Sequence, residues 1–323
     1  MQIDSFIIKQ LAQNCGFDLC GIAKAKPLSI AKERFENAVA NNFHAKKEYL
    51  ERDIERRFHP ALLFDNCKTV IVCGFNYNMR ERACEKRESA HRTQNNLEKY
   101  KISKYAQIKD YHVFMKEKLE RLAQGLKDKY GDFNYKTTVD SSTISEKAWA
   151  VQAGVGYYGK NGIIQTSLGS FVFLGVLLID KDVDKYEEPS NRNCGNCCLC
   201  MAACPNRAII APYCVDSNRC ISTINLNKNE TNFSSIAQYG WIVGCDECQE
   251  VCPNNKQAPI SKEALALQAS FFDNQNKILE TLTPESFECN FKDTNIYKLK
   301  YEGLKIRMEA VENYFQIQQN RFC

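Results

Sequence analysis

The chain has 323 residues, of which 44% are hydrophobic and 25% charged, and its formal net charge at pH 7 is +4. No run approaches the roughly 20 consecutive apolar residues of a transmembrane helix, so the composition excludes a membrane-spanning protein and predicts a soluble globular one. The small positive charge does not by itself indicate a nucleic-acid-binding protein, because a local basic patch is invisible in a whole-chain sum.

The first part of the chain mixes amphipathic helices with short apolar runs. Ile3, Ile7, Leu11 and Cys15 recur at helical spacing, and Gly16 is expected to end that helix. A short apolar run follows at residues 17–22, buried strands are predicted at residues 69–75, 135–139 and 170–179, and a further amphipathic helix is predicted around residues 113–126. These elements predict a mixed α/β (α+β) domain over residues 1–185.

Residues 186–258 carry a dense cysteine pattern, to which eight of the seventeen cysteines belong. The pattern is C-x2-C-x2-C-x3-C-P, then a lone cysteine, then C-x2-C-x3-C-P, which is the ligand spacing of a protein with two 4Fe-4S clusters. In ferredoxins of this kind the fourth cysteine of each run serves the other cluster. We therefore predict two crossed ligand sets, which are Cys194, Cys197, Cys200 and Cys252, and Cys204, Cys220, Cys245 and Cys248.

Disulfides and zinc are the alternatives to clusters. Disulfide frameworks suit small secreted chains, whereas this chain begins without an apolar signal segment, which favours the cytoplasm. Zinc explains paired C-x2-C units but neither the third closely spaced cysteine nor the two Cys-Pro endings. The pattern therefore favours two clusters and a protein that moves electrons.

The remaining regions indicate a role beyond electron transfer. A ferredoxin needs only the cysteine region, which we predict to be a ferredoxin-type domain, so the large first domain is expected to bind a substrate or second cofactor against the clusters. Residues 259–323 are polar with helical periodicity and predict a short helical C-terminal tail.

Several short motifs stand outside the cysteine pattern. They are KISKYA at 101–106, KDYH at 109–112, VDSS at 139–142, EKA at 146–148 and GKN at 159–161. Together with the cysteines they resemble the epoxyqueuosine reductases over nearly the whole chain. The resemblance implies an oxidoreductase that binds cobalamin in its first domain, takes electrons from a low-potential donor through two 4Fe-4S clusters, and reduces epoxyqueuosine to queuosine at the wobble position of tRNA.

The resemblance also implies roles for single residues. Asp140, directly after a predicted strand, matches the family's proposed proton donor; from its position alone, an Asp capping the next helix is an equal alternative, with Ser141 and Ser142 sharing that role. Cobalamin contacts are implied for Arg57, Ser103, Tyr105 and Asp140.

The glycine string that contains Gly154, Gly156 and Gly159 matches G-x-G-x-x-G, which alone suggests a dinucleotide fold. No strong strand precedes it and no helix follows, so a tight turn is the better interpretation. Lys160 in this turn is expected either to contact a polar group of a cofactor or to be solvated. We interpret His112 as a hydrogen-bonded structural histidine rather than a cobalt ligand.

A tRNA substrate requires basic side chains for phosphates and aromatic rings for an unstacked base. The candidates are Lys101, Lys104, Lys109, Lys298, Lys300, Lys305, Arg307, Tyr297 and Tyr301. Two alternatives remain open: a related corrinoid iron-sulfur reductase with another substrate, and an electron-transfer protein that feeds a partner.

Overall fold

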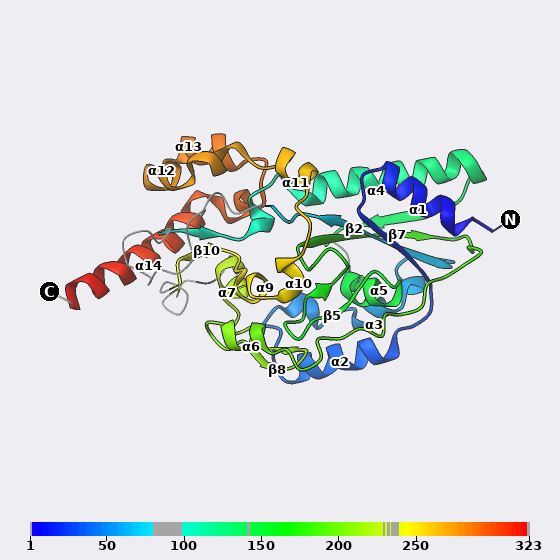
Figure 1. Ribbon diagram of the computed structural model, residues 1–323, viewed down its shortest axis with the longest axis horizontal. Coiled ribbons are helices and arrows are strands. Elements are labelled where there is room, and N and C mark those ends of the chain that lie inside the picture. The colour runs from blue at the N-terminus through cyan, green and yellow to red at the C-terminus, as the bar shows by residue number, and fades with distance from the viewer. Residues whose placement is uncertain are drawn as a thin grey trace.

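The computed structural model describes residues 2–79, 99–140, 143–228, 230, 233 and 239–321. Its central element is a four-stranded sheet in the order β1-β2-β7-β4, in which every neighbouring pair is antiparallel (Figure 1). The strands are β1 (Leu19–Lys24), β2 (Thr69–Asn76), β7 (Val172–Ile179) and β4 (Tyr135–Thr138). β2, β7 and β4 were predicted, with ends within about two residues of those observed, and β1 overlaps the apolar run at 17–22; the fold is a mixed α/β one.

Helices cover both faces of this sheet. On one face α1 (Ser5–Asn14) and α4 (Tyr111–Tyr130) pack over Ile71, Cys73 and Phe75 of β2. On the other face α5 (Glu146–Gln152) packs over Val70 and Val72. Successive side chains of a strand point to opposite faces, so β2, with a helical layer on each side, is buried at every position.

The predicted first helix and the helix at 113–126 are confirmed, and each has identifiable end signals. The Asp4 carboxylate accepts a hydrogen bond from the Phe6 amide at 2.8 Å, and Gly16 with φ +83° follows the helix end. Asp110 caps α4 by accepting from the His112 amide at 3.1 Å. This cap starts α4 at the edge where β4 ends, close to Asp140.

Shorter elements complete the first domain. They are α2 (Ser29–Ala40), α3 (Ile54–Phe58), the 3-10 turns η1 (Glu48–Leu50), η2 (Pro60–Leu62) and η4 (Lys104–Ala106), and the hairpin of β5 (Tyr157–Tyr158) and β6 (Ile164–Gln165). Of the glycine string, Gly154 and Gly156 lie between α5 and β5, and Gly159 lies in the turn of this hairpin. A Cβ at Gly156 would lie 2.4 Å from the Gln165 carbonyl oxygen, so the string serves close backbone packing rather than a dinucleotide fold.

The cysteine region is built from short helices and strands. They are α6 (Leu199–Ala203), β8 (Ile209–Ala211), β9 (Cys214–Val215), α7 (Ile221–Leu226), β10 (Trp241–Val243), α9 (Glu247–Glu250) and α10 (Pro253–Lys256). Helices α6 and α9 pack together although α6 lies in the first cysteine run and α9 in the second. In Figure 1 α7 and α9 lie between α14 and the sheet, and α6 lies at the lower edge of the view.

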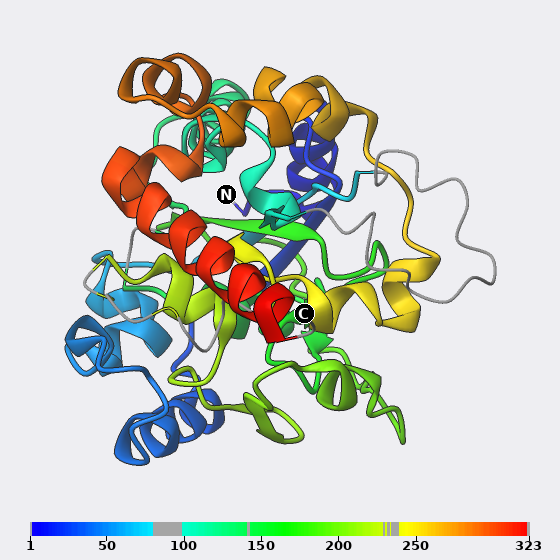
Figure 2. The ribbon, with the colours of Figure 1, turned by 90° about the vertical axis from the view of Figure 1, so that its left-hand side faces the viewer.

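The tail consists of α11 (Lys262–Ala266), η5 (Ser270–Asn274), α12 (Gln275–Glu280), α13 (Pro284–Phe291), η6 (Asn295–Leu299) and α14 (Lys300–Arg321). Its apolar core includes Phe271, Phe287 and Leu304, and Figure 2 shows α14 running across the face of the molecule. The helical character of the tail agrees with the sequence periodicity.

One strand from the first half of the chain belongs to the tail's core. β3 (Lys101–Ile102) pairs in parallel with β10, and Tyr100 and Ile102 are buried among the tail residues. Hydrophobic packing therefore crosses the predicted boundaries at residues 185 and 258, which stay predictions as limits of domains. Among the described helices, none combines the length and apolarity needed to cross a membrane.

Candidate active site

The first predicted cysteine set comes together in the structure. The Cys200 thiol is within electrostatic range of Cys194, Cys252 and Cys197, and Cys252 is in turn within range of Cys194 and Cys197. Burial, and then these neighbouring thiols, raise the pKa of both Cys200 and Cys252. A cysteine 58 positions away from Cys194 thus joins the first run, as the crossed assignment requires.

The second set assembles in the same way. Cys248 lies within electrostatic range of Cys220 and Cys204, and Cys245 within range of Cys248 and Cys220. Burial raises the pKa of both Cys245 and Cys248, so these thiols are protonated until a metal binds and displaces the proton. Four soft sulfur donors in each group fit a 4Fe-4S cluster.

No three His, Cys, Asp or Glu side chains in the described part of the chain converge on a point that could hold a single metal ion. A cubane distributes its thiolates over four iron atoms, so its ligands are spread around a volume and need not meet at one point.

The second set lies against the first domain. Asp246, between two of its ligands, is buried and accepts hydrogen bonds from Ser103 Oγ at 2.6 Å and from the Lys104 amide at 2.7 Å. Asn161 hydrogen-bonds Cys248. The loop that carries Cys245 and Cys248 is therefore fixed to two motifs of the first domain, one around residue 103 and one around residue 161.

Gly244 permits this close approach. Its φ is +66°, and a Cβ there would lie 2.5 Å from the Cβ of Ser103 and 2.9 Å from a ring carbon of Tyr105. Both the left-handed backbone and the lack of space require glycine at this position. Sequence reasoning missed this role, although Gly244 lies in the stretch GCDECQ.

Asp140 lies at the end of β4 in a left-handed conformation, with φ +52°. Its amide donates to Glu146 Oε1 at 2.6 Å, and its Oδ2 accepts from the Tyr111 hydroxyl at 2.8 Å and lies 3.6 Å from His112 Nε2. The N-cap of α5 is Ser145, with no capping side-chain bond, so the helix-cap alternative for Asp140 is wrong. Ser141 and Ser142, named with it, lie outside the described residues.

His112 is hydrogen-bonded, as predicted. Its Nδ1 contacts Asp110 Oδ1 at 2.6 Å, and Lys298 from η6 reaches Asp110 Oδ2 at 3.1 Å. Burial alone would lower the pKa of His112, but the contacts with Asp110 and Asp140 outweigh burial and raise it to about 9. Burial opposes ionisation of Asp110 too, yet hydrogen bonds from His112 and Lys298 lower its pKa to about 2.

The two carboxyl groups nearest this histidine are shifted in opposite directions. Neighbouring groups partly shield the Asp140 carboxyl from water and so raise its pKa, but contacts with His112 and Tyr111 outweigh this effect, and the net pKa lies below its usual value. Burial is the main reason that the pKa of Glu146 rises to about 8, and the Asp140 charge adds to it. Two carboxyls with separated pKa values beside a charged imidazole make a site capable of proton transfer. Sequence reasoning assigned no role to Glu146, Tyr111, Asp110 or Lys298 in proton chemistry, although all but Lys298 lie in motifs that it had singled out.

Arg57 is buried and contacts Thr143, three residues after Asp140. Its guanidinium donates to the Tyr49 carbonyl at 2.6 Å and to the Thr143 carbonyl at 3.4 Å. Its Nε is buried without a hydrogen-bond partner in the described part of the protein, so one donor is available to a polar ligand.

The other predicted cofactor contacts differ in their surroundings. Tyr105 packs against both the sheet core and the tail core. The Ser103 hydroxyl is already engaged with Asp246. Lys160 is buried, its Nζ donates to the Gly195 carbonyl at 2.7 Å, and it lies 3.7 Å from the Cys198 sulfur, so the solvated alternative for this lysine is wrong.

The basic candidates for tRNA contact fall into three groups, of which Lys101, half-buried and paired with Glu247, forms one by itself. Arg307 is only 3% exposed and donates to the backbone carbonyls of Asn225, Gly303 and Asn227, and Lys104 is 9% exposed and pairs with Glu250 at 2.6 Å. The prediction that Arg307 and Lys104 bind phosphate is therefore wrong, because their charged groups are buried and paired within the protein. Exposed basic candidates are Lys109, Lys298, Lys300 and Lys305.

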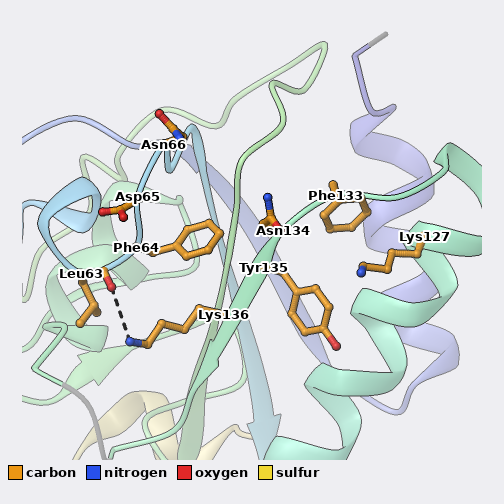
Figure 3. A pocket seen from close by; sticks show the side chains of 9 residues that line it. All are labelled: Leu63, Phe64, Asp65, Asn66, Lys127, Phe133, Asn134, Tyr135 and Lys136. Atoms are coloured by element: carbon orange, nitrogen blue, oxygen red, sulfur yellow. Dashed lines mark hydrogen bonds between the residues drawn. The ribbon is translucent and has the colours of Figure 1, made fainter.

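A hollow of about 600 Å³ lies away from this chemistry. Figure 3 shows its lining, in which Phe64 and Tyr135 flank the first residues of β4 and Lys136 donates to the Leu63 carbonyl. Asp140 follows the last residue of the same strand. The hollow is therefore at the opposite end of β4 from Asp140 and is not the active site.

These features define a class of protein: an iron-sulfur oxidoreductase whose double-cluster region abuts an acid-base site in an α/β domain. Residues 57–141 match the family model "Epoxyqueuosine reductase QueG, DUF1730", and residues 193–255 match "4Fe-4S double cluster binding domain". The chain is 34% identical over 312 residues to an epoxyqueuosine reductase from Cyclobacterium marinum, which covers 95% of this chain and 96% of that protein. The chain belongs to the epoxyqueuosine reductase family.

Further relatives agree with this placement. An epoxyqueuosine reductase from Cellulophaga algicola is 36% identical over 313 residues, covering 95% of this chain and 98% of the relative. A crystal structure of epoxyqueuosine reductase with an epoxyqueuosine-modified tRNA stem loop superimposes with a TM-score of 0.80 at 25% identity, covering 95% of this chain and 80% of that one.

Proposed function

We propose that this protein reduces the epoxide of epoxyqueuosine in tRNA to give queuosine. The observation that carries the proposal is sequence identity of about one third with curated epoxyqueuosine reductases along nearly the full length of both chains. The grouping of eight thiols beside an acid-base site is the arrangement that a reductive, proton-consuming ring opening requires.

The two thiol sets are the proposed ligands of two 4Fe-4S clusters, which supply low-potential electrons. The set with Cys220, Cys245 and Cys248 is the one joined to the first domain through Asp246, so we infer that it is the set nearer the substrate. The other set includes Cys194 and Cys197 and is the proposed entry point from an external donor.

Cobalamin is the second cofactor that we propose, and it would supply the metal centre that attacks or reduces the epoxide. Its site is formed by the region between Asp140 and the Cys245 loop. The unpaired Nε of buried Arg57 fits a polar group of such a ligand, and Tyr105 offers an aromatic face between two cores. Ser103 and Lys160 are held by protein partners, so their proposed part is to position the loops around the site.

Asp140 is the proposed catalytic residue. Opening an epoxide releases an oxygen anion, which needs a proton. The Asp140 side chain is 64% exposed, and its backbone amide is held by Glu146. The exposed carboxylate can therefore reach a nucleoside while its backbone stays in place.

The test is nucleoside mass spectrometry. Anaerobically purified protein, with cobalamin and a chemical reductant, is incubated with tRNA that carries epoxyqueuosine. We expect conversion to queuosine that depends on added cobalamin and on the iron content of the protein. Unchanged epoxyqueuosine under these conditions, with clusters intact, would contradict the proposal and favour a related reductase with another substrate.

A second measurement distinguishes the proposed reductase from a protein that only transfers electrons to a partner. Such a protein would contain reducible clusters but would not change the absorbance spectrum of added cobalamin. We expect spectral changes on binding and reduction. A cytoplasmic location follows as an expectation from the tRNA substrate, and the physiological donor is expected to be a low-potential one.

A further inference from the structure

The charges around Asp140 raise a question about where its proton comes from. Asp140 is proposed to protonate the oxygen released from the epoxide, yet its surroundings stabilise the ionised form. A carboxylate without a proton cannot act as the acid, so a neighbouring group has to hold one. The described side chains in contact with the Asp140 carboxylate are Tyr111 and His112.

The geometry distinguishes these two neighbours. His112 Nε2 lies 3.6 Å from Asp140 Oδ2, and its other ring nitrogen is 2.6 Å from Asp110 Oδ1. The ring therefore spans two carboxylates, and each of its nitrogens faces an acceptor. An imidazolium satisfies both contacts, whereas a neutral ring satisfies only one as a donor.

Residues from several elements orient this histidine. Asp110 is fixed as the N-cap of α4 and pairs with Lys298 from η6, while the His112 ring stacks on Tyr111 with centroids 4.1 Å apart. Lys298 also lies 3.1 Å from His112 Nδ1, so its positive charge opposes protonation of the ring. Two carboxylates outweigh this one ammonium, as the raised pKa of His112, about 9, indicates.

We propose that His112 is the proton-supplying residue behind Asp140, with Asp110 and Lys298 positioning its ring. The inference rests on the proposed function. Nε2 of the imidazolium gives its proton to the Asp140 carboxylate, and the Asp140 carboxyl passes that proton to the oxygen as the epoxide C–O bond breaks. The complete reduction releases this oxygen as water and consumes two protons, with two electrons from the low-potential donor. The His112–Asp140 pair supplies the proton for ring opening, and solvent supplies the second proton and reprotonates the ring, which is 26% exposed.

The other groups that face the pair have different parts. Tyr111 has a pKa raised far above its ordinary value, mainly by burial, so it stays a neutral hydrogen-bond donor to Asp140. Glu146 is the competing proton source, because burial raises its pKa to about 8. Its Oε1 is occupied by the Asp140 amide at 2.6 Å, which gives it a structural role.

The first test is the pH dependence of single-turnover epoxide reduction by pre-reduced enzyme. Wild-type protein is expected to keep a constant rate through neutral pH and lose it as pH rises through about 9, the pKa of His112. In His112→Gln, which keeps a side-chain amide but cannot titrate, the rate is expected to fall about tenfold per pH unit from pH 6 to 8. Tyr111→Phe is the matched control, with a lower rate but the wild-type pH profile.

A second measurement follows the imidazole directly. NMR titration of oxidised protein, assigned by its loss in His112→Gln, is expected to show a pKa well above 6.5 that falls in Asp110→Asn. A His112 pKa at or below 6.5, or a His112→Gln profile parallel to wild type, overturns the proposal. The titration uses no substrate, so it stays interpretable even if the proposed reaction fails.

Discussion

Asp140 combines a carboxylate with a backbone conformation that few residues adopt readily. Its φ of +52° is in the left-handed region, where Asn and Asp are the most tolerated non-glycine residues. Asp140→Asn therefore preserves the backbone and removes only the acid. We expect turnover on epoxyqueuosine tRNA to fall about 100-fold or more, the usual range for loss of a positioned acid.

The matched control is Asp65→Asn. Asp65 is exposed and lines the hollow at the opposite end of β4, so the same chemical change there is expected to leave turnover unaltered. Iron content and tRNA affinity should stay at wild-type values in both variants. Equal turnover of Asp140→Asn and wild type would remove Asp140 from the proposed mechanism.

Glycine substitutions give a second residue-scale prediction. Gly244→Ala places a Cβ 2.5 Å from Ser103 Cβ at a φ of +66°, so we expect a lower melting temperature and partial loss of the cluster held by Cys245 and Cys248. Gly125→Ala is the control. It is helical, its nearest contact is Leu11 at 3.5 Å, and the change is expected to stabilise the protein by about 0.5–1 kcal/mol. Thermal unfolding measures both, and similar shifts in the two variants would contradict the packing argument.

At the scale of elements, the crossed thiol sets predict which double variants lose one cluster and which lose two. Cys194→Ser with Cys252→Ser alters a single set, so about four irons per chain should remain. Cys194→Ser with Cys204→Ser alters both sets although the residues are close in sequence, so nearly all iron should be lost. Iron analysis and EPR of the reduced protein distinguish the cases, and the reverse pattern would refute the crossing.

Elements differed in how far the sequence could predict them. β2 and β7 were predicted because each is a largely apolar run, which can be recognised without knowing its partner strand, whereas β4 was predicted from its β-branched and aromatic residues. The thiol sets were predicted because cysteine spacing reflects the local geometry of one cofactor. The β3–β10 pair was not, because two- and three-residue strands carry no periodic signal and depend on a partner about 140 positions away.

The proton-transfer cluster shows the same limit. Asp140 could be proposed from its motif, but its link to His112 requires the end of β4 to meet the start of α4, and Lys298 arrives from the tail. Residue spacing in the sequence gives no signal for contacts between such distant segments. For the same reason, the sequence did not indicate that Arg307 and Lys104 are buried. A lysine or arginine has the same one-letter code whether its side chain is solvated or paired inside the protein.

At the scale of the whole molecule, Arg307 ties the tail to the cysteine region. Its guanidinium donates hydrogen bonds to the carbonyls of Asn225 and Asn227, at the end of α7. The guanidinium carbon also lies 4.5 Å from the centre of the Phe233 ring. Arg307→Met removes these charge-assisted hydrogen bonds of a buried guanidinium, so we expect destabilisation of about 3 kcal/mol and a clearly lower melting temperature.

The control for this prediction is Lys305→Met, two positions earlier on α14. Lys305 is exposed and its closest acidic partner, Glu309, lies 3.9 Å away, so the change should alter stability by less than about 0.5 kcal/mol. If Arg307→Met instead unfolds at the wild-type temperature and only weakens tRNA binding, the buried role of Arg307 is incorrect.

The pairing of β3 with β10 also determines how the protein can be divided. A polypeptide that stops at residue 185 would expose Tyr100 and Ile102, whose covering strand and helices are synthesised later. The N-terminal half is therefore not an autonomous folding unit. Tyr100 and Ile102 become enclosed only after α14 has been synthesised. Separate expression of residues 1–185 and of the remainder of the chain should yield aggregation-prone fragments, which regain solubility only when both are produced together.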